Sequence, residues 1–296
     1  MAEQVIEPGD ILRDTAPRPV DGFEHRYELV IPEAWKVMYA FGGVTFAAAL
    51  RAIEAAVDRD DLRLVSAEGT FCQAIPTGAV AIDVEVLRQG RSGAQAQARM
   101  WATDDPTGDA RGDLVVNAVL GAPRQWHEPV IGRTFPEHAL LPEDSRIRIE
   151  PPEDSDFPRI PYHDQTDWRI ATGRAPWDPD DGALPEPWSV SWFRFHRSPA
   201  RPDGTWEPAT LAVPGDILGP AVLGATRGID GFFFVITLQM SVQFFAPMRG
   251  ECLLQHTRAT SVADGFATGV ADLWSEDGVL VGQASQTALL QPMKPG

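Results

Sequence analysis

The chain repeats one order of elements, an apolar helix followed by four strand-like runs, and this repeat limits its fold more than any other feature. Residues 44–57 carry apolar side chains three and four positions apart, which predicts a buried helix opened by the pair Gly42 and Gly43. In the second half, residues 217–225 predict a helix that Asp216 caps. The strand-like runs are 62–71, 80–87, 94–102 and 114–120 in the first half, and 232–245, 252–260, 265–274 and 279–290 in the second. A duplicated unit of this kind predicts an α+β fold in which each half packs one helix on an antiparallel sheet.

The region between the halves has a different composition, because residues 121–220 contain 17 of the 26 prolines. Proline interrupts helices, so long helices are not expected there. Trp188, Val190 and Trp192 alternate as on one face of a strand, which predicts that this region adds an edge strand or two. We therefore expect an N-terminal half over residues 1–122, a connector over 123–209 and a C-terminal half over 210–296. No flexible Gly/Ser linker separates the halves, so we expect their sheets to join edge to edge.

Charge and cysteine usage exclude several classes of function. The 25 Lys and Arg residues against 42 Asp and Glu residues give a net charge of −17, which argues against nucleic-acid binding and adsorption to an anionic membrane. Neither the two cysteines, 180 residues apart, nor the six histidines have metal-ligand spacing. The N-terminus lacks a signal-peptide pattern, and no run has the pattern of a membrane span. We expect a cytoplasmic protein without cofactor or metal.

Short motifs in both halves resemble the acyl-CoA thioesterase II type (TesB-like) family of double hotdog proteins. In the first half they are Phe41-Gly42-Gly43 at the helix start, Ile75-Pro76-Thr77-Gly78, and the run 86–92. In the second half they are Leu238-Gln239-Met240-Ser241-Val242-Gln243-Phe244, Arg258-Ala259-Thr260-Ser261, and the run 277–286, DGVLVGQASQ. The resemblance covers about residues 30–120 and 213–292 and implies a pseudo-dimer of two hotdog folds, each a long helix wrapped by an antiparallel sheet.

The resemblance also implies a hydrolase of acyl-CoA thioesters, active in fatty acid metabolism, that uses a water held by an Asp, a Ser or Thr, and a Gln. Carried over by position, these residues are Gln239, Thr260 and Gln286, so an amide stands where the family has a carboxylate. An amide cannot accept a proton as a general base, although it can orient a water. We expect the three side chains to converge, and turnover to be modest and nearly independent of pH.

The expected substrate site combines backbone donors and arginines. Gly42 and Gly43 at the helix start let backbone N–H groups approach a thioester carbonyl. Because CoA carries phosphates, a basic island is expected, with Arg88 and Arg91 assigned to substrate binding, and with further candidates at Arg99, Arg249 and Arg258. The expected partner is acyl-CoA or another acyl thioester, and the sequence leaves open a homo-oligomer of pseudo-dimers.

Two alternatives remain open at this point. Without the carboxylate, the protein could bind an acyl thioester with little or no hydrolysis. Hotdog folds also host dehydratases and cyclases that act on acyl thioesters. In the connector, the polar run from Tyr162 to Asp167 favours a turn over the lining of a cleft.

Overall fold

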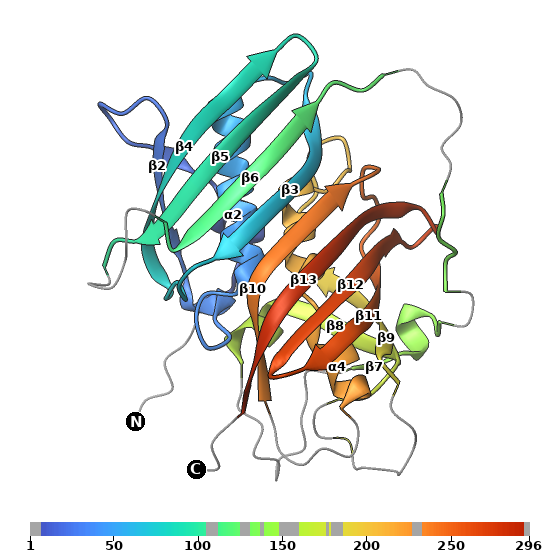
Figure 1. Ribbon diagram of the computed structural model, residues 1–296. Helices are drawn as coiled ribbons and strands as arrows, with labels where there is room; N and C mark the ends of the chain where they lie inside the picture. The colour runs from blue at the N-terminus through green and yellow to red at the C-terminus, as the bar shows by residue number, and fades with distance from the viewer. Residues whose placement is uncertain are drawn as a thin grey trace.

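The computed structural model describes residues 7–104, 112–124, 131–136, 139–147, 160–175, 178, 186–226 and 233–292. Within these ranges the strands form a single sheet of 13 strands in the order β1-β2-β4-β5-β6-β3-β10-β13-β12-β11-β9-β8-β7. All of its pairings are antiparallel. The two halves lie side by side along this sheet, with their helices on one face (Figure 1).

The strands of the two halves confirm the predicted repeat. The first half contains β1 (Arg18–Pro19), β2 (Arg26–Ile31), β3 (Arg63–Phe71), β4 (Gly78–Gly90), β5 (Gly93–Ala102) and β6 (Leu114–Gly121). The second half contains β10 (Phe233–Phe244), β11 (Leu253–Ala263), β12 (Phe266–Ser275) and β13 (Leu280–Pro292). The orders β2-β4-β5-β6-β3 and β10-β13-β12-β11-β9 mirror each other, so the chain folds as a double hotdog.

The halves join where β3 pairs with β10, residues 66–70 lying opposite residues 239–243. This pairing confirms the expected edge-to-edge sheet. It matters for the site, because it fixes residues 239–243 of β10, which directly follow Thr237 and Leu238, beside the first half.

The connector extends the sheet of the second half. β9 (Trp188–Phe195) pairs with β11, β8 (Thr166–Thr172) pairs with β9, and β7 (Arg146–Ile147) pairs with β8. The predicted edge strands are thus present. The domain boundaries at residues 122 and 210 stay a prediction. Short 3₁₀ turns complete the connector: η2 (Pro142–Asp144), η3 (Pro161–Gln165) and η4 (Pro208–Leu211).

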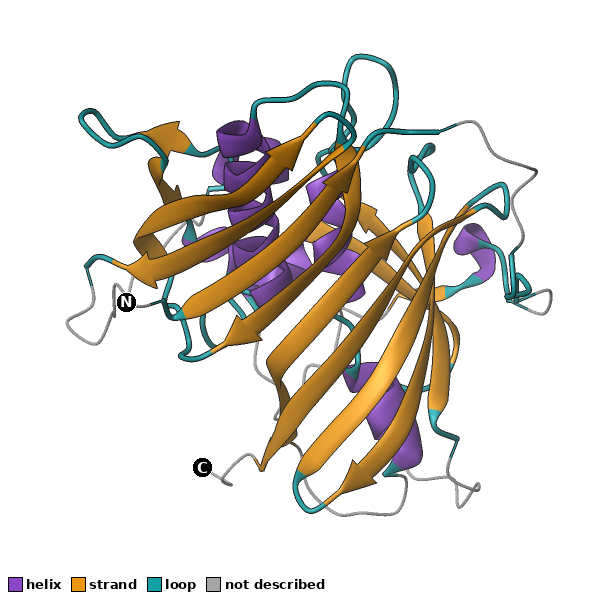
Figure 2. Cartoon of the chain, turned by 45° about the horizontal axis from the view of Figure 1, so that its top comes forward, coloured by secondary structure: helices purple, strands orange, loops and turns teal. Residues whose placement is uncertain are grey.

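The helix of the first half is α2 (Gly42–Val57), which lies against one face of the sheet (Figure 2). Twelve of its sixteen residues are buried. Its alanines and its apolar positions three and four apart let it lie close against the sheet. It ends at Asp58, which adopts the left-handed conformation with a φ of 48°.

The helix of the second half is interrupted, which corrects the expectation of one helix capped by Asp216. α3 (Ala212–Gly215) and α4 (Gly219–Ala225) are separated by residues 216–218, and α4 begins after Leu218. Asp216 is the residue after α3, and its side chain accepts from the Gly43 N–H of α2, while α4 begins without a side-chain cap. Because Asp216 lies between the two short helices, its carboxylate bonds to the first half of the protein instead of capping α4.

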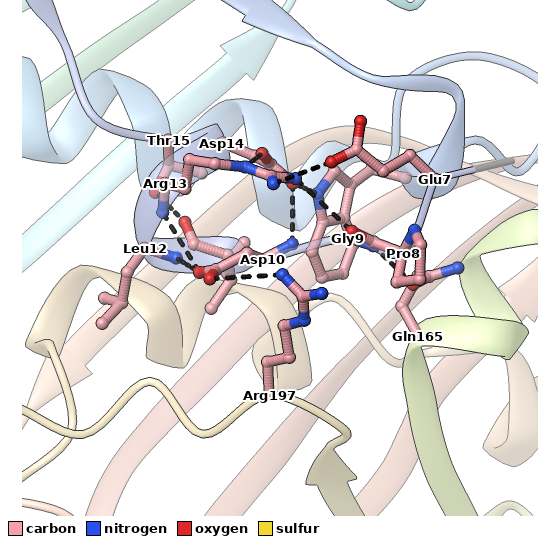
Figure 3. Close-up of polar contacts among 12 residues, drawn as sticks. Glu7, Pro8, Gly9, Asp10, Leu12, Arg13, Asp14, Thr15, Gln165 and Arg197 are labelled. Atoms are coloured by element: carbon pink, nitrogen blue, oxygen red, sulfur yellow. Dashed lines mark hydrogen bonds and ion pairs between the residues drawn. The ribbon is translucent and has the colours of Figure 1, made fainter.

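The N-terminal segment fastens the first half to the connector (Figure 3). Asp10 caps α1 (Ile11–Asp14) by accepting from the N–H groups of Leu12 and Arg13, and its carboxylate lies 3.7 Å from Arg197. The N–H of Gly9 donates to Gln165 Oε1 at 2.7 Å. Nearby, η1 (Glu33–Trp35) supplies a Trp35 indole that donates to Asp14.

Among the described residues no helix has the length and apolar character needed to cross a membrane.

Candidate active site

Three polar side chains of the second half meet beside the start of α2. Thr237 Oγ1 donates to Asp216 Oδ1 at 2.7 Å, and Gln286 Nε2 contacts the same oxygen and also Thr237 Oγ1, the latter at 3.0 Å. The second oxygen, Asp216 Oδ2, accepts from the backbone N–H of Gly43 at 2.8 Å. The cluster thus joins the turn after α3, strands β10 and β13, and the first helix.

The amide of Gln286 has a fixed orientation. Its Oε1 accepts from the N–H groups of Ile217 and Leu218, at 3.0 and 2.8 Å. Since the oxygen is held by these two donors, the Nε2 group must face Asp216 and Thr237. Gln286 is 7% exposed, which makes this one buried hydrogen-bonded network.

A β-bulge decides which residue of β10 joins the network. Thr237 pairs with Ala288 of β13 and Gln239 pairs with the next residue, Thr287, so Leu238 has no partner. A bulge changes which face of the sheet the following side chains occupy. Thr237 therefore faces the helices together with Met240, and Gln239 faces solvent.

The Asp216 carboxyl is electrostatically perturbed. Burial raises its pKa from 3.8 to about 6, and the hydrogen bonds from Thr237, Gly43 and Gln286 oppose that rise because they favour the ionised form. The residue is enclosed by protein but remains partly accessible through an adjoining cavity. A carboxyl that titrates near neutrality suits proton transfer at neutral pH.

The three side chains line a cavity of about 380 Å³ with largely apolar walls. The first half contributes Phe41 and Phe71, and the connector contributes Tyr162, His163 and Trp168. Tyr162 stacks on Phe41 with ring centroids 4.2 Å apart. The run from Tyr162, for which a turn was the favoured prediction, forms both a 3₁₀ turn and part of this wall.

Both glycines at the start of α2 are required by close contacts. A Cβ on Gly42 would lie 2.6 Å from Asp216 Oδ2, and a Cβ on Gly43 would lie 2.7 Å from the carbonyl oxygen of Ala212. Gly42 lines the cavity, and its assignment to substrate binding stays a prediction. The Gly43 N–H, by contrast, is committed to Asp216 rather than to a substrate carbonyl.

The predicted convergence of Gln239, Thr260 and Gln286 is wrong for two of the three residues. Gln239 is exposed and its amide contacts Glu68 of β3 on the outer face of the sheet. Thr260 is exposed at a bulge of β11, and β12 separates that strand from β13. Gln286 alone lies in the network, and its catalytic role stays a prediction.

The predicted basic island is not at the cavity. Arg88 and Arg91 are exposed in and after β4, and Gln89 Nε2 bonds the carbonyl of Val57 at the C-terminal end of α2. The site lies at the other end of that helix, which is about 24 Å long. Arg99 and Arg258 pair with Glu85 and Asp272, and Arg249 bonds the Asp203 carbonyl; none of the five arginines lines the cavity.

Sequence reasoning missed the roles of Asp216 and Thr237. A signal for Asp216 was present, because it is the sole charged residue in the otherwise apolar run 208–226. In the sequence a helix cap was a sufficient explanation for this residue, but in the structure Asp216 bonds Gly43, Thr237 and Gln286 and does not cap α4. The described residues contain no group of three or more His, Cys, Asp or Glu side chains that could hold a metal ion.

Comparisons with known proteins agree with this architecture. The family model for the acyl-CoA thioesterase N-terminal domain matches residues 31–120, and the model for the C-terminal domain matches residues 142–290. A search of curated proteins finds no match.

Solved structures share the fold over almost the whole chain. A hot dog fold protein from Alicyclobacillus acidocaldarius is 20% identical with a TM-score of 0.72, covering 97% of this chain and 98% of that one. A protein from Novosphingobium aromaticivorans is 26% identical with a TM-score of 0.70, at coverages of 92% and 98%. Acyl-CoA thioesterase II TesB2 from Mycobacterium marinum is 20% identical with a TM-score of 0.70, at coverages of 96% and 99%. With the C-terminal model alone matching half of the sequence, the chain belongs to the acyl-CoA thioesterase family.

Proposed function

We propose that the protein hydrolyses an acyl-CoA thioester to a free acid and CoA, with Asp216 as the general base. The observation that carries this proposal is a buried carboxyl with a pKa raised to about 6 in the wall of an apolar cavity. The bonds from Thr237 and Gln286 hold its Oδ1 in one place, and Gly43 holds Oδ2. Such preorganisation is what proton transfer from a bound water requires.

The proposed reaction uses one water per turnover. Asp216 accepts a proton as the water oxygen attacks the thioester carbonyl carbon. The tetrahedral intermediate then expels the thiolate, which takes the proton from Asp216, so the carboxylate is regenerated. Gly42 is the first residue of α2, its N–H has no hydrogen-bond partner in the described part of the chain, and the residue lines the cavity. This N–H is our candidate donor to the carbonyl oxygen, because helix N-termini stabilise negative charge.

The same carboxyl weighs against the alternative of binding without hydrolysis. That alternative rested on an amide at the acidic position, and Asp216 supplies the carboxylate from a different element. We also propose that the acyl group of the substrate is carried on CoA. A homo-oligomer of this chain is likewise a proposal.

The test is release of free thiol from straight-chain acyl-CoAs of increasing length, with wild type and Asp216→Asn assayed in parallel. Each methylene that enters the apolar cavity contributes about 0.8 kcal/mol, so kcat/KM should rise roughly fourfold per added methylene until the cavity is full. Asp216→Asn should lower kcat by about 10²–10⁴-fold, the usual contribution of a general base. Absence of thiol release at every chain length, with acyl-CoA binding retained, would replace the hydrolase with a binding protein.

A further inference from the structure

Two glutamine side chains bind backbone groups at the interruption between α3 and α4, where Pro220 in the first turn of α4 also disfavours a continuous helix. In a continuous α-helix the N–H of Leu218 would donate to the carbonyl of Pro214, four residues earlier. Here Leu218 N donates to Gln286 Oε1 at 2.8 Å, and Gln255 Nε2 donates to the Pro214 carbonyl at 2.8 Å. Asp216, between the two intercepted groups, has a φ of −85° and a ψ of 64°, outside the helical region.

Gln255 is itself fixed by a buried chain of hydrogen bonds. It lies on the helix-facing side of β11 and is 1% exposed. Its Oε1 accepts from Ser191 Oγ of β9 at 3.0 Å, and Ser191 Oγ accepts from Trp168 Nε1 of β8 at 2.8 Å. Because the oxygen of the amide is occupied by Ser191, its NH₂ group faces Pro214. The chain runs from the aromatic wall of the cavity to the turn that carries Asp216.

Other polar groups on this face are not held in the same way. Ser189 and Thr257 are paired across β9 and β11, two residues from Ser191 and Gln255, and their buried hydroxyls have no hydrogen-bond partner among the residues that the structure describes. The hydrogen bonds of Gln255 are therefore not a general property of buried polar groups on this part of the sheet. The Gln255 amide donates to the carbonyl of Pro214, which has no donor within the interrupted helix.

We propose that Gln255 is a positioning residue for Asp216, which keeps the α3–α4 helix open by occupying the carbonyl of Pro214. The inference rests on the proposed function, since it assigns to Gln255 the placement of the general base. Without this donor, the buried Pro214 carbonyl regains a partner when Leu218 N–H bonds to it, which winds residues 214–218 into one helical turn that ends before Pro220. That change rotates Asp216 away from Gly43 and Thr237.

The first test compares Gln255→Leu with Thr257→Val by steady-state hydrolysis of octanoyl-CoA. A displacement of about 1 Å in a catalytic group lowers a rate up to about 10²-fold, so kcat of Gln255→Leu should fall by about 10- to 100-fold. Its KM should change less than its kcat, since the rewound turn supplies only residues 216–218 of the cavity wall. Thr257→Val lies on the same strand face and removes only an unpartnered hydroxyl, so it should keep both constants. Folded Gln255→Leu enzyme with wild-type kcat overturns the proposal.

A second variant, Gln255→Glu, covers the case in which Gln255→Leu fails to fold. A protonated glutamic acid donates to the Pro214 carbonyl as the amide does, whereas the ionised form has no proton to donate. The pH–rate profile should therefore turn from a rise and plateau in wild type into a bell, with activity lost as the introduced carboxyl ionises. A melting temperature measured at each pH separates this loss from unfolding, and a profile identical to wild type overturns the proposal.

Failure of the proposed function gives a different result. Wild type without thiol release from any acyl-CoA of the length series refutes the hydrolase, and the role of Gln255 is then decided by a crystal structure of Gln255→Leu. A bond between Leu218 N and the Pro214 carbonyl supports the positioning role. An unchanged turn, with Asp216 still bonded to the Gly43 N–H, refutes it.

Discussion

The carboxyl of Asp216 should destabilise the fold at the same pH at which it becomes active. Burial raises its pKa from 3.8 to about 6. A carboxyl with a higher pKa in the folded state binds its proton more tightly there than in the unfolded chain. Its contribution to stability is therefore fully present below 3.8, and it is lost as the pH rises through about 6.

The magnitude follows from the two pKa values. Their difference corresponds to about 3 kcal/mol, at 1.36 kcal/mol for each pKa unit. This is an upper value, because the Asp216 side chain is partly accessible through the cavity. In Asp216→Asn the side chain keeps its size and does not titrate. The unfolding free energy of the variant relative to wild type should rise by up to about 3 kcal/mol between about pH 4 and pH 7. The introduced asparagine amide also changes the hydrogen bonds with Gln286, but this effect does not depend on pH and therefore cancels when the two pH values are compared.

Urea unfolding of both proteins at the two pH values measures this change, and thiol release measures its functional counterpart. Wild-type kcat should rise with pH and level off above about 6, in the same window as the loss of stability, and the variant should show no such step. A stability difference that is constant with pH, or that changes in the opposite direction, would refute the assignment of a raised pKa to Asp216.

Three further substitutions test the geometry around the site. Gly43→Ala should lower the unfolding free energy by about 1–3 kcal/mol in urea, because its Cβ would meet the α3 backbone at 2.7 Å. Gln239→Asp should leave kcat for acyl-CoA unchanged, since this side chain lies on the solvent face; a rate increase would return the site to the outer face of β10. Replacing Arg88 and Arg91 together by Ala should keep KM for acyl-CoA within about twofold at low salt, as both lie at the far end of α2; a strongly salt-dependent rise in KM would place the CoA phosphates there.

Local sequence patterns were enough to predict the repeated elements. Apolar spacing identified α2 within two residues of its observed start, and the strand-like runs identified eight of the ten strands of the two halves, missing β1 and β2. These patterns follow from burial of one face of an element, which neighbouring residues determine among themselves. The order of motifs also identified the family and one residue of the polar network, Gln286.

The remaining site residues depended on contacts between distant parts of the chain. Asp216 has the local pattern of a helix cap, and its partner Gly43 lies 173 residues away. Thr237 and Gln239 are equally plausible on an alternating strand, and the bulge at Leu238, which selects Thr237, is visible only in the pairing with β13.

Sequence alone thus determined α2 and eight strands of the two halves, because hydrophobic periodicity is a property of a few adjacent residues. Only the tertiary structure decided which polar side chains meet. Their meeting depends on strand register, on one unpaired residue and on an interrupted helix, and each of these is set by hydrogen bonds to residues remote in the chain.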